Sequence, residues 1–227
     1  MAERPGPGGR DRWPASFRRR QGQQTRAQRR ALREHWARFG VPWRYGEVLE
    51  LEALFGRGGP CTLEVGFGMG ECILSRAQAE PERNFLGVEV HLPAIGAVCA
   101  QAAAMGLENL RIVRGDVLRL LNDQLAPSLL DQVCVFFPDP FPRRPERRLM
   151  RPLFTELVAL HGRAGTELFL ATDIESYAEF AEEVVAQDPR FALRARGERP
   201  TFRPLSKYEA KGHAEGRETW ELRWALR

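Results

Sequence analysis

The sequence predicts an α/β protein with a mostly parallel, seven-stranded sheet and helices on both faces of that sheet. Apolar runs of strand length alternate with runs of helical periodicity, which is typical of parallel strands joined by crossover helices. The strand runs are apolar almost throughout, as expected where helices cover both faces. The first strand run ends in a glycine-rich turn that leads into a helical run, and such a unit brings backbone N–H groups close to a ligand.

The expected elements follow one another in a regular order. The predicted strands are residues 62–66, 84–90, 110–114, 132–137, 167–171, 191–194 and 219–226. The predicted helices are residues 25–40, 45–54, 70–78, 94–105, 117–121, 152–161 and 175–186. We expect the last two strands to complete the sheet after the final helix. In the first helix, Leu32, Trp36 and Phe39 share one face, and the other face carries Arg26, Arg29, Arg30 and Arg33.

The charge of the chain is distributed unevenly. The net charge is +4, yet residues 1–44 alone hold twelve Arg and only three acidic residues, so the rest of the chain is slightly acidic. We therefore divide the chain into a basic N-terminal arm with one helix, residues 1–44, and a single domain, residues 45–227. An arm of this charge favours a polyanionic partner. The alternatives are a solvated, disordered leader and an Arg-rich transit peptide, although the arm is poor in Ser.

The composition excludes several other classes of protein. With 43% hydrophobic and 28% charged residues, the 227-residue chain is typical of a globular domain with a substantial core. Its four cysteines form no Cys-x-x-Cys pair, so we expect reduced core residues in a cytoplasmic protein and no metal site. The longest uncharged segment, residues 91–107, is interrupted by Pro93 and Gly96, and we expect a buried helix there and no membrane span.

Acidic residues recur where the predicted parallel strands end: Glu64, Glu89, Asp116, Asp139 and Asp173. A single such acid is as often a helix cap or a surface residue as a ligand-binding residue. The carboxyl ends of the strands in a doubly wound sheet meet at one edge, and ligands bind there. Five acids in succession therefore predict one acidic binding site.

The glycine spacing after the first strand distinguishes two classes of cofactor. A dinucleotide site requires Gly-x-Gly-x-x-Gly, whereas here Gly66, Gly68 and Gly70 alternate and Glu71 stands where that pattern fails. The segment resembles the first motif of Rossmann-like methyltransferases that depend on S-adenosylmethionine. The resemblance implies that Glu64 lies near the ammonium group of this cofactor.

The same resemblance gives roles to two further acids. Glu89 would accept hydrogen bonds from the ribose hydroxyls, because it ends the second strand at about the expected separation from the glycine turn. Asp116 would accept from adenine N6, and it could cap the following helix at the same time.

Residues 136–144, Phe-Phe-Pro-Asp-Pro-Phe-Pro-Arg-Arg, form the second diagnostic segment. Prolines on either side of Asp139 predict a rigid turn that holds its carboxylate toward the sulfonium methyl. The alternative is a proline-rich connection with an exposed acid. A basic cluster follows, and positive charge is unfavourable at the start of a helix, so an anionic partner is favoured. Its members are Arg143, Arg144, Arg147, Arg148 and Arg151.

Several segments together resemble the bacterial tRNA (guanine-N7)-methyltransferase family. The matching stretches are residues 16–22 (SFRRRQG), 63–71, 84–91, 136–140, 171–173 (ATD) and 204–209 (PLSKYE). The resemblance implies methyl transfer from S-adenosylmethionine to N7 of a guanine in the tRNA variable loop. It implies cofactor binding by Glu64, Gly66, Gly68, Gly70, Glu89, Asp116 and Asp139. It implies substrate binding by Arg143, Asp173, Ser206, Lys207, Tyr208 and Glu209.

The chain departs from the family pattern at several positions. Phe141 stands where the family usually has Trp, Arg143 where it has Lys, and Ser206 where it has Thr. The basic segment before Arg147 is about two residues shorter and lacks the customary histidine. These changes keep charge and hydroxyl groups but alter the reach of the side chains, because Arg and Lys are not interchangeable at a tight site.

The implied mechanism makes Asp139 the catalytic residue. Asp139, with Asp173 or Glu209, would orient the guanine by accepting from its N1–H and N2 amine, while Arg143 and the arm bind phosphates. We expect tRNA as the partner, with no membrane and no obligate protein partner. Removing residues 1–20 should weaken tRNA binding and spare cofactor binding. A non-catalytic tRNA-binding paralogue and a small-molecule methyltransferase remain alternatives.

Overall fold

A seven-stranded sheet in the order β3-β2-β1-β4-β5-β7-β6 organises the computed structural model. The structure describes residues 15–17, 22–42, 47–127 and 129–227. The strands are β1 (Cys61–Val65), β2 (Asn84–Glu89), β3 (Leu110–Arg114), β4 (Leu130–Phe136), β5 (Gly162–Thr172), β6 (Phe191–Arg196) and β7 (Trp220–Leu226). The first five run parallel, and β7 pairs antiparallel with both β5 and β6, which confirms the predicted fold class.

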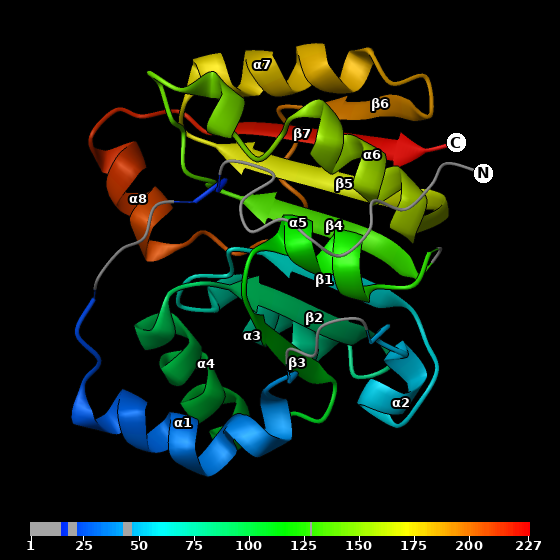
Figure 1. Cartoon of the computed structure of the whole chain (residues 1–227). Helices are drawn as coiled ribbons and strands as arrows, with labels where there is room; N and C mark the ends of the chain where they lie inside the picture. Colours follow the sequence, from blue (N-terminus) through cyan, green and yellow to red (C-terminus); the bar gives the residue numbers. More distant parts are fainter. Residues whose placement is uncertain (1–14, 18–21, 43–46, 128) are drawn as a thin grey trace.

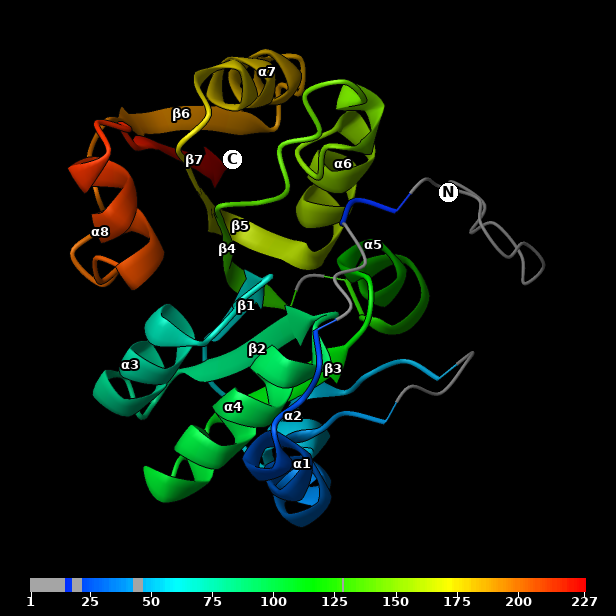
Figure 2. The ribbon, with the colours of Figure 1, turned by 90° about the vertical axis from the view of Figure 1, so that its left-hand side faces the viewer.

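Helices cover both faces of the sheet (Figures 1 and 2). They are α1 (Arg26–Phe39), α2 (Leu51–Phe55), α3 (Glu71–Ala79), α4 (Leu92–Ala104), α5 (Val117–Arg119), α6 (Pro152–His161), α7 (Glu175–Ala186) and α8 (Lys207–Ala214). The crossovers through α3 and α4 lie on one face, and those through α5, α6 and α7 lie on the other. Each face has its own cluster of buried apolar side chains.

Three local predictions were wrong. The helix predicted at 45–54 is shorter, because Leu49 is extended and donates its N–H to Gln124 O at 2.5 Å; α2 starts only at Leu51. The helix predicted at 117–121 is α-helical only to Arg119 and continues as a π-helix, Leu120–Gln124. Helix α8 was not predicted at all. Residues 1–12, whose Pro-, Gly- and Arg-rich sequence predicts disorder, lie outside the described residues.

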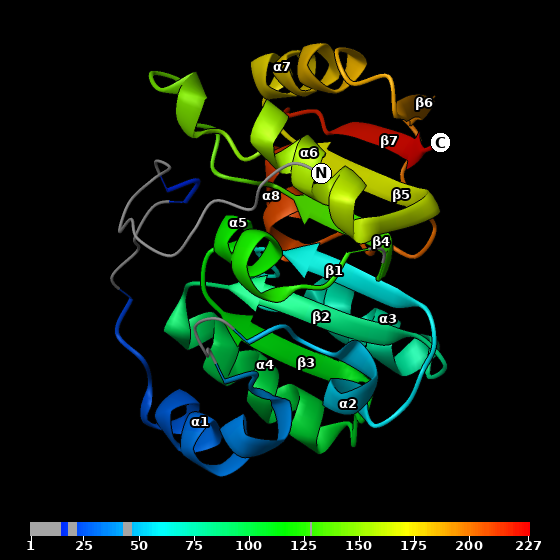
Figure 3. The same cartoon turned by 45° about the vertical axis from the view of Figure 1, so that its right-hand side comes forward.

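Helix α1 packs against α4, so the helix of the predicted arm is attached to the sheet domain (Figure 3). A capping box of Thr25 and Gln28 starts α1, and Ala31 and Phe39 are buried. After α1, Val41 donates its N–H to Ile112 O at 2.8 Å, so the chain passes directly along strand β3. The predicted boundary between residues 44 and 45 lies outside the described residues and stays a prediction.

Three features of the described residues bear on the excluded classes. All four cysteines are buried and unbridged. No helix among the described residues is both long and apolar enough to cross a membrane. The described part of the chain also brings together no group of three or more His, Cys, Asp or Glu side chains suited to a metal ion.

We predict that Gly96→Ala destabilises the protein although alanine favours helices. A Cβ at Gly96 would lie 2.7 Å from Gln28 O in the backbone of α1, so the two helices would have to separate. This cost of about 1–3 kcal/mol exceeds the gain in helix propensity of about 1 kcal/mol. Urea unfolding measures the difference. The control Ala100→Gly, exposed on the same helix, should cost about 1 kcal/mol by propensity alone; a more stable Gly96→Ala would contradict the packing argument.

Candidate functional site

A cavity of about 650 Å³ opens at the carboxyl ends of the parallel strands. It lies beside β1 and β4, where the strand order reverses, which is the position at which open α/β sheets bind ligands. Its volume is suited to a ligand of cofactor size. The predicted site residues that line it are Glu64, Gly66, Gly68, Glu89, Asp116, Asp139, Asp173, Ser206 and Lys207. Thus the acids predicted from the ends of five strands share one cavity.

Three of the other predicted site residues, Gly70, Arg143 and Glu209, do not line this cavity. Gly70 is the N-cap of α3, and a Cβ there would meet Val98 at 2.5 Å, so this glycine allows α3 and α4 to pack closely. Arg143 is exposed and outside the cavity lining. Tyr208 lies in the first turn of α8, and Glu209 follows it, buried.

The glycine turn after β1 leaves open space above its backbone. Gly66 and Gly68 have φ values of 70° and 52°, in the left-handed region that favours glycine. Nothing lies within 4 Å of a Cβ built at either residue, so the backbone itself forms the surface of the cavity. This is the close approach of backbone to a ligand for which glycine is used.

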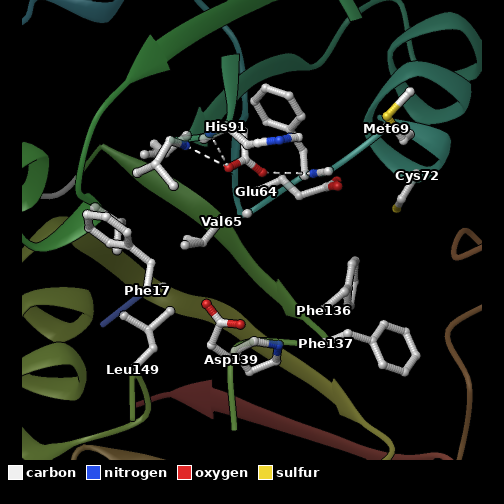
Figure 4. Close-up of a pocket in the computed structure, with 18 of the residues that line it drawn as sticks. Phe17, Glu64, Val65, Met69, Cys72, His91, Phe136, Phe137, Asp139 and Leu149 are labelled. Carbon is white, nitrogen blue, oxygen red and sulfur yellow. Dashed lines mark hydrogen bonds between the residues drawn. The ribbon is translucent and has the colours of Figure 1, made fainter. Parts of the chain in front are cut away.

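The carboxylate of Glu89 fixes this turn to the end of β2. Its Oε2 accepts from Gly68 N at 3.1 Å, and its Oε1 accepts from Val90 N at 2.6 Å and His91 N at 2.9 Å. A carboxylate offers about four acceptor sites, so Glu89 keeps capacity for a hydroxyl of a ligand in the cavity. Figure 4 shows the hydrogen bonds among these lining residues.

Glu64 is a buried acid under the same turn. Its side chain is 3% exposed, and burial raises its pKa to about 7 against the opposing charge of Arg76 and hydrogen bonds from Cys72 and Ile73. Its Oε2 has no hydrogen-bond partner. An orphaned carboxylate oxygen on the wall of a cavity indicates a position where a cationic or hydrogen-bond-donating group binds.

Arg76 of α3 interacts electrostatically with Glu64 and was not predicted as a site residue. Its guanidinium is 3% exposed and donates to Glu80 at 2.8 Å and to Gln132 at 2.8 Å. It also lies 3.9 Å from the ring centroid of Phe202, in the segment that leads to α8. Periodicity alone could not identify it, because these contacts join three distant parts of the chain.

Asp139 lies in a strained turn between β4 and the basic segment. Phe137 and Phe141 have φ values of 51° and 39°, which costs of the order of 1–3 kcal/mol for each non-glycine residue. Arg148 donates to Pro140 O at 3.0 Å, and this hydrogen bond stabilises the turn. Figure 4 shows Asp139 between Phe17 and Leu149 on one side and Phe136 and Phe137 on the other.

Asp116 and Asp173 both interact with other groups of the same chain. Asp116 caps α5 by accepting from Leu118 N at 2.9 Å, and burial raises its pKa. Asp173 forms an ion pair with Arg217, which follows α8. Ser206 caps α8 by accepting from Glu209 N at 3.1 Å. The ion pair and the cap fix both ends of α8 beside the cavity.

Glu209 belongs to a buried ionic network that the sequence did not predict. Arg203 donates to both oxygens of Glu209 at 2.8 Å and also pairs with Glu221 of β7, while Arg199 lies 2.5 Å from Glu209. Although burial raises it, these bonds and charges leave the pKa of Glu209 below its ordinary value. The guanidinium of Arg203 lies 5.5 Å from the ring centroids of Phe136 and Phe137. The network therefore connects α8 and β7 to the turn of Asp139.

The basic cluster after Asp139 is divided: Arg148 and Arg151 are buried and bind carbonyl groups of the protein, whereas Arg143 and Arg144 are exposed. Arg148 is 6% exposed and also donates to Ser176 O at 2.8 Å, and Arg151 donates to Glu146 O at 2.8 Å. Arg144 pairs with Glu146 at 2.8 Å. That the cluster meets an anionic partner stays a prediction.

Arg147 attaches the N-terminal segment to the cavity. It donates to Ala15 O and to Phe17 O, both at 3.0 Å. Ser16 is buried, and both Ser16 and Phe17 line the cavity. The described start of the arm is therefore part of the cavity wall.

Comparisons with known proteins agree with this geometry. A family model described as "Putative methyltransferase" matches residues 58–222. The tRNA (guanine-N(7)-)-methyltransferase of Chromohalobacter salexigens is 42% identical over 227 aligned residues, covering 96% of this chain and 92% of that protein. The protein of the same name from Nitrosococcus oceani is 42% identical, covering 92% of this chain and 89% of that protein. Among solved structures, the 16S rRNA methyltransferase KamB has the same fold, with a TM-score of 0.62 at 17% identity over 83% of this chain and 99% of that one.

We predict that Glu64→Gln flattens the pH dependence of stability. A pKa raised from 4.5 to about 7 means that the folded state holds the proton more tightly, so stability falls by up to about 3 kcal/mol as pH rises through this window. Glutamine carries no charge, and the variant should gain relative stability at pH 8 but not at pH 4.5. Urea unfolding at both pH values measures the effect, with Glu179→Gln, exposed on α7, as the control. Equal pH slopes for Glu64→Gln and the wild type would contradict it.

Proposed function

The chain belongs to the tRNA (guanine-N(7)-)-methyltransferase family, and we propose that it transfers a methyl group from S-adenosylmethionine to N7 of a guanine in the variable loop of tRNA. The observation that carries this proposal is that one cavity is lined by the glycine turn, by Glu64 and Glu89, and by Asp139 on its strained turn. On this proposal the protein works in the cytoplasm, where its tRNA substrate is found.

The residues of the cavity fit S-adenosylmethionine. The open space above Gly66 and Gly68 would be filled by any side chain there, and it suits a ligand that lies against backbone. The orphaned Oε2 of Glu64 suits the ammonium group, and Glu89 keeps acceptor capacity for ribose hydroxyls. Asp116 lines the cavity with one oxygen engaged by the cap of α5, and its other oxygen would accept from an adenine amine.

The proposed reaction needs alignment more than proton transfer. S-adenosylmethionine supplies an electrophilic methyl group when it is bound. Guanine N7 already carries a lone pair, so no general base is required. Positive charge moves from sulfur onto the purine as the bond from N7 to the methyl carbon forms and the bond from that carbon to sulfur breaks, which leaves a neutral thioether. Asp139 orients the guanine by accepting from its N1–H and N2 amine, and its negative charge favours the cationic base. Asp173, held by Arg217, is the second acceptor.

The family and the site favour this function over both alternatives. A small-molecule methyltransferase does not need a basic arm joined to the wall of the cavity. A non-catalytic paralogue does not need a strained turn to hold Asp139, because such strain is retained where function depends on it.

We predict that the wild type transfers labelled methyl groups from S-adenosylmethionine to unmodified tRNA and that Asp139→Asn does so at least a hundredfold more slowly. Asparagine keeps the shape of the side chain but loses the charge and one acceptor. Cleavage selective for 7-methylguanosine locates the modified base. The control Asp188→Asn, far from the cavity, should be as active as the wild type. Failure of the wild type to label tRNA would refute the proposed function, whereas labelling by Asp139→Asn at the wild-type rate would show that Asp139 is not the catalytic residue.

A second prediction replaces the expectation that the arm is dispensable for cofactor binding. Removing residues 1–17 deletes Ser16 and Phe17 from the cavity wall and leaves Arg147 without two acceptors, so the dissociation constant for S-adenosylmethionine should rise about tenfold. Calorimetric titration measures this change. Removing only residues 1–14 keeps both contacts and should leave cofactor binding unchanged; equal affinities of the two truncated proteins would contradict the prediction.

A further inference from the structure

Helix α1 begins at the edge of the molecule that carries the cavity. Strand β2 ends there, His91 lines the cavity, and α4 starts with the next residue. The close approach of Gly96 to Gln28 places the first turns of α1 beside the first turns of α4. At the other end of α1, Arg38 donates to Leu107 O at 2.9 Å, after the end of α4. Figure 1 shows α1 starting on the side to which the arrowheads of β1 and β2 point.

The N-terminal half of α1 presents positive charge to solvent on this side. Arg26, Arg29 and Arg33 are exposed, and their spacing of three and four residues places them on one face. We call these three residues the α1 rim. Arg30 pairs with Glu34 at 2.7 Å, but the α1 rim forms no ion pair with any described residue. The first turn of α1 contains no acidic residue.

This arrangement is electrostatically unfavourable for the helix itself. The N-terminal end of a helix carries partial positive charge, so acidic residues are favoured there and arginines are not. The buried face of α1 fixes the helix on α4 through Ala31 and Phe39, so the rim is held rigidly. Rigid, exposed and unpaired arginines suit the phosphates of a polyanion, which the planar guanidinium binds with two parallel hydrogen bonds.

We propose that the α1 rim binds the sugar-phosphate backbone of tRNA outside the loop that carries the methylated guanine. This inference rests on the proposed function and adds to it a second contact surface, separate from the cavity. When the target base lies beside Asp139, the rest of the RNA extends over the edge of the sheet at which the parallel strands end. From the cavity, this edge continues past His91 and the start of α4 to the α1 rim. The rim then contributes to affinity and orientation and does not take part in methyl transfer.

The test compares two triple variants that lose the same charge. Arg26→Gln/Arg29→Gln/Arg33→Gln removes the rim, whereas Arg163→Gln/Arg190→Gln/Arg227→Gln removes three arginines at the opposite, amino-end edge of the sheet. There β5 begins at Gly162, β6 begins at Phe191 and the chain ends just after β7. Filter binding of wild-type and variant proteins to full-length tRNA over a series of salt concentrations gives the dissociation constant and its salt slope.

Loss of the rim should raise the dissociation constant for tRNA at least tenfold at low salt and make the logarithmic salt slope shallower by about two units. The opposite-edge control should stay within about twofold of the wild type. Turnover at saturating tRNA and the affinity for S-adenosylmethionine should not change. If the rim variant and the wild type have equal tRNA affinities and equal salt slopes, the inference is overturned. The charge of the rim would then suit a different partner, such as an acidic protein.

A charge-reversal variant separates binding from folding. In Arg26→Glu/Arg29→Glu/Arg33→Glu, the new acids suit the N-terminal end of α1, so the urea midpoint should be equal to or above that of the wild type. Its tRNA affinity should nevertheless be lower than that of the glutamine variant. If the wild type methylates tRNA and both rim variants bind it normally, only this inference fails; if the wild type does not methylate tRNA, the proposed function fails first.

Discussion

The reversal of strand order beside β1 is the constraint on which the site depends. The chain moves from β1 outward to β3 and then returns to the other side of β1 with β4, so successive crossovers leave the sheet in opposite directions. The helices on the two faces therefore diverge at the carboxyl ends of β1 and β4. Five of the acids that line the cavity lie at or after the ends of strands: Glu64, Glu89, Asp116, Asp139 and Asp173. A sixth acid, Glu71, lines it from the start of α3.

This arrangement requires the burial of charged side chains, which is unfavourable because it removes them from water. Glu64 is buried with an orphaned oxygen, and Arg203 with Glu209 and Glu221 forms a network that is almost entirely excluded from solvent. Buried ion pairs seldom add much stability, because desolvation offsets their attraction. Their value here is positional: Arg203 joins α8 and β7 to the aromatic residues that precede Asp139, and Glu64 gives one wall of the cavity an unpaired acceptor oxygen.

The sequence was sufficient to predict the strands and the acids at their ends, because both follow local rules. Apolar runs locate β1 to β5, and the topology then places Glu64, Glu89 and Asp139 together without knowledge of any contact. The sequence could not show that Arg147 binds the carbonyls of residues 15 and 17, about 130 residues earlier, since nothing local marks such a pair. Likewise α8 has weak helical periodicity, and its stability comes from Glu209 and from the Asp173–Arg217 pair. The burial of Arg148 and Arg151 could not be predicted either, because a run of arginines does not reveal which of them face carbonyl groups.

The antiparallel end of the sheet has a consequence for biosynthesis. Strand β7 is the last element of the chain, yet it lies between β5 and β6, and β6 pairs with β7 on its inner side. During translation β6 therefore has no partner in the sheet until β7 has been synthesised, and Arg203 pairs with Glu221 only at that stage. A nascent chain that has already assembled β1 to β5 still lacks the network behind Asp139, so this network is completed only once β7 has joined the sheet.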